Sequence, residues 1–204
     1  MHATPSSTLP ATAGGLAPTV ERTPLEQPTT RPRPPTARDL SLALLGLVGL
    51  GAAAALGAEP GASALRLAPS VLMVDLAAMV LTAPALIAAH QFLRLAASPE
   101  ALAAGLGRAL IDGGRIAGAL ALVVLFFAAT TNLAIVALLA ALLAVGVFTS
   151  VTACVELSAA ERRAGDVVGY FPLLLIGWLA LSWMIALRVG VDVGGWVLGF
   201  GGRL

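Results

Sequence analysis

The sequence predicts an all-α membrane protein, a polytopic bundle of about five transmembrane helices with one additional amphipathic helix at the membrane interface. Of its 204 residues, 58% are hydrophobic and only 11% are charged, whereas about a quarter of the residues of a soluble domain are charged. The mean hydropathy is +0.93. The apolar run Ile116–Cys154 is nearly twice as long as one crossing helix, and its only polar interruption before its far end is Thr130-Thr131-Asn132, which predicts two spans joined by a tight turn.

The chain divides into a tail over residues 1–38 and a helical membrane domain over residues 39–204. The tail is rich in Pro, Thr, Ser and Ala and has no apolar run. Such a composition buries too little apolar surface to offset the chain entropy lost on folding, so we expect a disordered tail. It also lacks the apolar core of a signal peptide, which predicts that the N-terminus stays on the cytoplasmic side.

The first span is expected at about residues 40–58. Gly49, Ala53 and Gly57 recur at every fourth residue, and small residues at this spacing let a neighbouring backbone come close. The segment Glu59-Pro60-Gly61 should end the helix, because Pro disfavours a helical residue before it and Gly tolerates a turn.

The second span, at about residues 67–89, contains an acid, Asp75, and a proline, Pro84. A carboxylate is costly in hydrocarbon, and three explanations of Asp75 stay open. It faces the bundle interior, it handles a proton or a substrate, or it lies near the interface because the helix begins only around Ser70; we favour the last. Pro84 should kink this helix and is a candidate hinge.

An amphipathic helix in the interface plane is expected after the second span. Ser98 caps the free N–H groups, Pro99 stands where a missing N–H costs nothing, and Glu100 meets the positive end of the helix dipole. Apolar and charged side chains then fall on opposite faces, as in an interfacial helix. The apolar face holds Leu102, Leu106 and Leu110, and the charged face Glu100, Arg108, Asp112 and Arg115.

The third and fourth spans are expected at residues 116–129 and 133–153. Because the third is short for a crossing, we expect Arg115 to snorkel and the helix to include residues of the preceding segment. A capping box, Ser158 followed three residues later by Glu161, then predicts a separate short charged helix.

The charged residues of that segment indicate a solvated loop. Glu156, Glu161 and Asp166 resemble an acidic cluster, but two Arg residues lie among them, and a charge-balanced loop beside the membrane explains them better than catalysis or metal binding.

The fifth span is expected at residues 170–187, with Tyr170 and Trp183 as interface anchors near its two ends. The tail from Arg188 onward contains many glycines and is too short to cross again. We expect it to rest on the membrane surface.

Arginine positions predict the orientation, because cytoplasmic loops carry an excess of basic residues. One side of the predicted topology holds Arg22, Arg31, Arg33, Arg38, Arg94, Arg108, Arg115, Arg162 and Arg163, and the other holds Arg66, Arg188 and Arg203. We therefore expect a cytoplasmic N-terminus and a periplasmic C-terminus. The absence of Lys and the abundance of Ala, Gly, Leu and Val indicate a GC-rich bacterial genome. We expect a multi-pass protein of the inner membrane.

No catalytic, cofactor-binding or metal-binding pattern is visible in the sequence. Gly113-Gly114 fits no nucleotide-binding fingerprint, and no HExxH occurs. Cys154 is the single cysteine, and His90 has no ligand-type residue near it in sequence, so an interfacial histidine is the simpler explanation. A net charge of +1 with scattered Arg residues argues against a nucleic-acid partner. We expect no enzyme and no cofactor, with the lipid bilayer and membrane or cytoplasmic proteins as partners.

Residues 89–187 carry a resemblance, mainly in the segments HQFLRLAASPEALAAGLGRAL and VELSAAERRAGDVVGYFPLLL. With their order of spans and charged segments they resemble the bacterial Yip1-like proteins, five-span membrane proteins with a cytosolic, often Pro-rich N-terminal tail. Ala97-Ser98-Pro99 stands where the family has Gly-Ser-Phe, and the usual Pro at the start of span three is missing. The resemblance implies a non-enzymatic membrane organiser, related in eukaryotes to vesicle trafficking and small GTPase partners, and assigns no functional residue.

Two functional hypotheses follow. The first is a non-catalytic integral membrane protein that acts through protein or lipid contacts, as a Yip1-like organiser. The alternative is a small transporter or channel component, in which Asp75 lines a polar path and Pro84 is the hinge.

Overall fold

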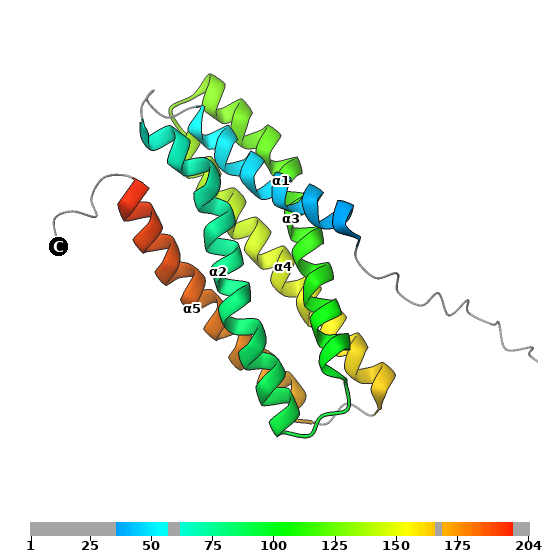
Figure 1. Ribbon diagram of the computed structural model, residues 1–204. Coiled ribbons are helices and arrows are strands. Elements are labelled where there is room, and N and C mark those ends of the chain that lie inside the picture. The colour runs from blue at the N-terminus through cyan, green and yellow to red at the C-terminus, as the bar shows by residue number, and fades with distance from the viewer. Residues whose placement is uncertain (1–35, 57–61, 166–168, 198–204) are drawn as a thin grey trace, which may run out of the picture. The chain divides into compact units, whose positions relative to one another are not determined.

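The computed structural model describes residues 36–56, 62–165 and 169–197 of the chain. In these ranges the protein consists of five helices and contains no strand. The helices are α1 (Ala37–Ala55), α2 (Ala62–Phe92), α3 (Pro99–Thr130), α4 (Ala134–Ala164) and α5 (Phe171–Val197) (Figure 1). Each is long and apolar enough to cross a membrane. The predicted helical fold with five spans is confirmed, and the chain is a multi-pass membrane protein.

Several predictions concern residues outside the described ranges. These are the disorder of most of the N-terminal tail, the helix stop at Glu59-Pro60-Gly61, Asp166, and the end of the Gly-rich tail. The last residues assigned to the tail, however, belong to α1. Thr36 caps this helix, because its side chain accepts a hydrogen bond from the backbone N–H of Asp39 (3.2 Å) while the Asp39 carboxylate accepts one from the N–H of Thr36 (3.2 Å).

Small residues bring α1 and α3 close together, but not those that the spacing in α1 predicted. A Cβ atom on Gly46 would overlap the carbonyl oxygen of Gly114, and it would lie 3.0 Å from the backbone nitrogen of Gly118. Gly49 has no atom within 4 Å of such a position, so the predicted strip was wrong there. The glycines of the partner helix decide which face of α1 is used, and one helix alone does not reveal them.

The start of α3 confirms the predicted cap and corrects the predicted interfacial helix. The Ser98 side chain accepts a hydrogen bond from the N–H of Ala101 (3.3 Å), and Pro99 is the first helical residue. The helix then continues without a break to Thr130. Its apolar residues Leu102 and Leu106 are buried in a core that includes Leu157 of α4. The apolar face is therefore covered by protein, and the third span takes in the preceding segment, as expected from its short apolar length.

The turn between α3 and α4 confirms the predicted hairpin, since α3 ends at Thr130 and α4 begins at Ala134. The capping box at Ser158 is wrong, because α4 runs unbroken to Ala164. Helical periodicity continues through Ser158, and the Glu161 carboxylate is used in contacts with another part of the chain.

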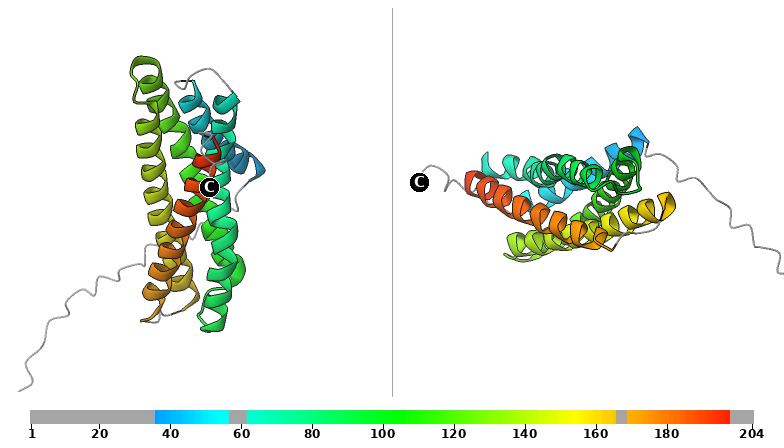
Figure 2. Two further views of the ribbon diagram at one scale, coloured as in Figure 1. Left: turned by 90° about the vertical axis from the view of Figure 1, so that its left-hand side faces the viewer. Right: turned by 90° about the horizontal axis from the view of Figure 1, so that it is seen from below.

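The fifth helix continues past Arg188 to Val197, so the segment that was expected to rest on the membrane surface extends the span. α5 packs closely against α2 but not against α4, and it runs beside α2 in both Figure 1 and Figure 2. This arrangement leaves a space between α4 and α5, where the candidate site lies.

Two buried apolar clusters hold the helices together. One joins α1, α3 and α4 and includes Leu47, Leu50, Ala117, Val124 and Leu138. The other joins the ends of α2 and α4 to the starts of α3 and α5 and includes Leu86, Leu102, Leu157, Phe171 and Trp178. Such burial of side chains within the bundle also fixes which faces remain for lipid.

Candidate functional site

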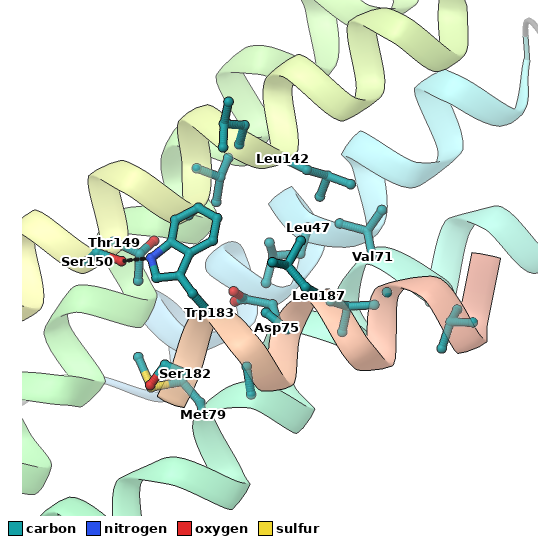
Figure 3. A pocket seen from close by; sticks show the side chains of 18 of the residues that line it. Leu47, Val71, Asp75, Met79, Leu142, Thr149, Ser150, Ser182, Trp183 and Leu187 are labelled. Carbon is teal, nitrogen blue, oxygen red and sulfur yellow. Dashed lines mark hydrogen bonds between the residues drawn. The ribbon is translucent and has the colours of Figure 1, made fainter. Parts of the chain in front are cut away.

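A cavity of about 520 Å³ lies between α2, α4 and α5, with Leu47 of α1 also on its wall (Figure 3). Small-molecule sites typically have about 300–1,000 Å³, so the volume suits one ligand of moderate size. Most of the lining is aliphatic, from residues such as Val71, Leu142 and Leu187. The few polar groups in the lining therefore determine what chemistry the cavity offers.

Trp183 bridges α5 and α4 across the cavity. Its indole N–H donates to the hydroxyl of Ser150 (3.1 Å), as Figure 3 shows. The ring lies over Gly146, where an added Cβ would come within 2.9 Å of it. The indole ring of Trp183 therefore occupies space between α4 and α5. The sequence predicted Trp183 as an interface anchor near the end of its span, but α5 extends to Val197, so Trp183 lies well inside the helix.

The cavity opens sideways between α4 and α5. Leu139 and Leu143 on α4, and Leu187 and Val191 on α5, line the cavity and are also more than half exposed. In a membrane protein, exposed aliphatic side chains of spanning helices face lipid. The opening therefore leads into the hydrocarbon of the bilayer.

Asp75 projects from α2 into this apolar space (Figure 3). Because α2 begins at Ala62, the expected helix start near Ser70 is wrong. No ion pair in the described part of the chain includes Asp75. The three explanations of Asp75 stay predictions: interior packing, a role toward a proton or substrate, and a position near the interface.

Thr149 adds a second polar group to the wall. Its hydroxyl is buried and has no hydrogen-bond partner in the described residues, and the whole residue is only 8% exposed. The side chain packs against Gly113 of α3, where an added Cβ would overlap the hydroxyl oxygen. Buried hydroxyl groups normally have a partner, so Thr149 is an unsatisfied polar group where α4 packs against α3.

The deep end of the cavity is a polar junction between α2 and α5. Thr82 is fully buried; its backbone carbonyl accepts from the indole N–H of Trp178 (3.1 Å), and its hydroxyl accepts from Ser182 (3.0 Å). Pro84 lies two residues further along α2, inside the helix and outside the cavity lining. The structure thus separates the two candidate residues, and the hinge role of Pro84 stays a prediction.

A second buried polar cluster, which the sequence did not predict, lies where α2, α4 and the loop before α3 meet. One carboxylate oxygen of Glu161 contacts Nε2 of His90 (2.8 Å) and accepts from the N–H of Ala97 (3.0 Å), while the other accepts from the N–H of Ala96 (2.8 Å). His90 and Glu161 are both 0% exposed. The predictions of an interfacial His90 and a solvated Glu161 were therefore wrong, because each side chain is the other's buried partner.

The other ion pairs of the described residues lie at the surface or close to it. Arg108 of α3 pairs with Glu156 of α4, and Arg115 pairs with Asp39 of α1 (2.7 Å). Glu156 and Glu161 thus have separate partners and do not form one acidic cluster. In the described part of the chain, no group of three or more His, Cys, Asp or Glu residues is placed to hold a metal ion.

The chain matches no family model, no curated protein and no solved structure. Function must therefore be argued from the site itself. The cavity combines a mainly aliphatic lining and one carboxylate with a side opening toward lipid. These features suit the binding of an apolar molecule that carries a small polar part.

Hydrogen bonds in the cavity could have been anticipated only in part. On α5, Trp178 and Ser182 are four residues apart, which places them on one helix face. On α2, Asp75 and Thr82 are two turns apart and also share a face. That these two faces meet beside α4 depends on helix packing, which the spacing does not contain.

Proposed function

We propose that the protein is a non-catalytic multi-pass membrane protein that takes a lipid-like molecule from the bilayer into the cavity between α2, α4 and α5. The side opening of this cavity carries the proposal, because aliphatic residues such as Leu143 and Leu187 belong both to its lining and to the lipid-facing surface. A molecule dissolved in hydrocarbon reaches the cavity without crossing water. Binding gains from the apolar lining, and the polar groups orient the ligand.

A photoreactive lipid tests this proposal. The purified protein in lipid nanodiscs is exposed to a neutral long-chain alcohol that carries a diazirine in its chain, and the cross-linked residues are mapped by mass spectrometry. We expect cross-links to concentrate on cavity-lining residues of α4 and α5. Cross-links spread evenly over the lipid-facing surface would contradict the proposal.

Two glycines of α5 provide a matched pair of variants. Gly190 lines the cavity and Gly177 does not, and an added Cβ meets no atom within 4 Å at either position. Gly190→Phe should fill part of the cavity and reduce its cross-linking severalfold. Gly177→Phe adds the same ring to the same helix outside the cavity and should leave the cross-linking unchanged. Equal effects of both substitutions would show that the labelled site is not this cavity.

The proposed location is a bacterial inner membrane, with the N-terminus in the cytoplasm and the C-terminus outside. The distribution of arginines supports this orientation, and it agrees with the layout of the Yip1-like proteins that residues 89–187 resemble. An organiser role with membrane or cytoplasmic protein partners is compatible with lipid binding.

Cysteine accessibility tests the orientation. Ser7, Thr131 and Arg163 are replaced one at a time by Cys in a Cys154→Ser background and labelled with an impermeant maleimide. We expect Thr131→Cys to react in intact cells, and the other two only after permeabilisation. Labelling of Thr131→Cys and Arg163→Cys from the same side would refute the crossing of α4.

A second candidate is a small transporter or channel component with Asp75 on its path and Pro84 as its hinge. It is favoured by the position of Asp75 on the cavity wall without an ion-pair partner in the described residues. Proton entry into liposomes, followed with an entrapped pH dye, distinguishes the two. A proton path should be lost in both Asp75→Asn and Asp75→Leu, whereas a binding protein should give no flux in any form.

A further inference from the structure

We propose that the ligand of the cavity is a lipophilic cation, an amphiphile with one apolar chain and an ammonium-type head that pairs with Asp75. This inference rests on the proposed function and adds the charge of the ligand. It commits the cavity to a class of molecule that differs from neutral lipids, fatty acids and anionic phospholipids.

The charge of the lining carries the inference. Asp75 is the one charged residue among the described residues that form the cavity. The arginines of α3 and α5 that form ion pairs do so with acids other than Asp75: Arg108 with Glu156, Arg115 with Asp39 and Asp112, and Arg188 with Asp192. A carboxylate next to hydrocarbon requires a partner or a proton. A cationic head entering from the side opening supplies that partner.

The groups around Asp75 fit an organic cation better than a bare metal ion. A metal ion would need several oxygen or nitrogen ligands at close range, whereas the lining is mainly aliphatic and offers one carboxylate. The indole ring of Trp183 lines the same cavity (Figure 3), and aromatic faces attract ammonium groups.

An anionic ligand is disfavoured by the same geometry. A carboxylate or phosphate head in this space would meet Asp75 without a cation in the lining to separate them, and like charges at low dielectric repel strongly. A neutral ligand avoids this repulsion but leaves Asp75 to be neutralised by a proton. The charge of the ligand therefore separates the possible occupants, and matched probes measure it.

The experiment uses two surfactants with the same twelve-carbon chain. Dodecyltrimethylammonium is a cation, and dodecyldimethylamine N-oxide has a head of similar size without net charge at pH 8. Their affinities for the full-length protein in nanodiscs are measured below the micellar concentration by displacement of a tritiated photoreactive dodecyl alcohol. We expect the wild-type protein to bind the cation at least about tenfold more tightly than the amine oxide, a ratio that corresponds to about 1.4 kcal/mol.

Three variants separate charge from fold. Asp75→Asn should remove the preference, so that both surfactants bind with similar affinity, while Asp75→Glu should retain it. Asp192→Asn removes an acid of α5 that is paired with Arg188 and does not line the cavity, and it should leave the preference unchanged. Size-exclusion profiles and far-UV circular dichroism establish that each variant is folded.

The outcomes test the charge of the ligand and the existence of the lipid-binding site separately. Equal affinities for both surfactants in the wild-type protein, or a preference that survives in Asp75→Asn, would overturn the cationic ligand while leaving a lipid-binding cavity intact. If the folded wild-type protein binds neither of the two surfactants nor the dodecyl alcohol, both the proposed function and this inference are overturned.

Discussion

Replacement of Glu161 by alanine tests the buried cluster at the junction of α2, α4 and the loop before α3. The carboxylate contacts His90 and accepts hydrogen bonds from the N–H groups of Ala96 and Ala97, all within 3.0 Å. All three bonds join residues more than sixty positions apart in the chain. Glu161 therefore fixes the loop between α2 and α3 against the end of α4.

The cost of Glu161→Ala follows from the groups that it leaves without a partner. Two backbone N–H groups and one imidazole nitrogen lose their hydrogen-bond partner, and a buried unsatisfied polar group costs roughly 1–3 kcal/mol. Water entering the vacated volume relieves part of this. We therefore expect the free energy of unfolding to fall by about 3–5 kcal/mol, the lower part of the roughly 3–9 kcal/mol that three unsatisfied groups would cost.

The assay is reversible unfolding in mixed micelles, in which the fraction of SDS is raised and tryptophan fluorescence is recorded. Glu156→Ala is the control, because Glu156 also lies on α4 and also has a partner, Arg108, but both side chains of that pair are about a quarter exposed. A partly exposed pair contributes at most about 1 kcal/mol. If Glu161→Ala costs no more than Glu156→Ala, the buried cluster does not hold the loop in place.

Three further predictions use the same unfolding assay. Gly46→Val should destabilise the protein by about 1–3 kcal/mol, since its side chain would overlap α3, whereas Gly49→Val should change little; equal losses would refute the packing of α1. Trp183→Phe and Ser150→Ala both remove the same hydrogen bond between α5 and α4, and each should cost about 0.5–1.5 kcal/mol. The double variant should therefore lose less stability than the sum of the two single variants, and additive losses would show that the two groups act independently. Asp39→Asn removes the charge that pairs with Arg115 between α1 and α3; because this pair is exposed to solvent and screened, the variant should lose less stability than Gly46→Val, and an equal loss would contradict this.

The sequence predicted the helical class, the span number and the turn after Thr130, because these depend on apolar length and local chemistry. The cap at Ser98 was also correct, since its partners lie within three residues. Helix ends were less predictable where a helix outlasts its apolar run. α3, with 32 residues, is about 48 Å long, well beyond the thickness of the hydrocarbon core. Charged residues after or before a span are therefore not evidence of a new helix.

In the candidate site, the sequence predicted only Asp75 as a functional residue, because an acid within an apolar span is conspicuous. The partners of His90 and Glu161 could not be predicted, because 71 positions separate these residues and only the packing of α2 against the end of α4 brings them together. The predicted capping role of Glu161 shows the difficulty: a local motif and a distant partner compete for the same carboxylate, and the distant partners prevail here. The close contact of Gly46 with Gly114 and Gly118 of α3 could likewise not be predicted from α1 alone.

The position of α5 links the buried clusters to the cavity. Near its start, Phe171 is fully buried and lies edge-on to His90, with ring centroids 6.1 Å apart. About two and three helical turns further along α5, Trp178 and Ser182 form hydrogen bonds with Thr82 of α2. Beyond this junction, the contact with α4 runs through Trp183, and the lining residues are aliphatic and exposed toward lipid. The part of α5 beyond Trp183 thus forms one side of the opening with exposed aliphatic side chains such as Leu187 and Val191, so a ligand that enters from the bilayer first meets an apolar surface.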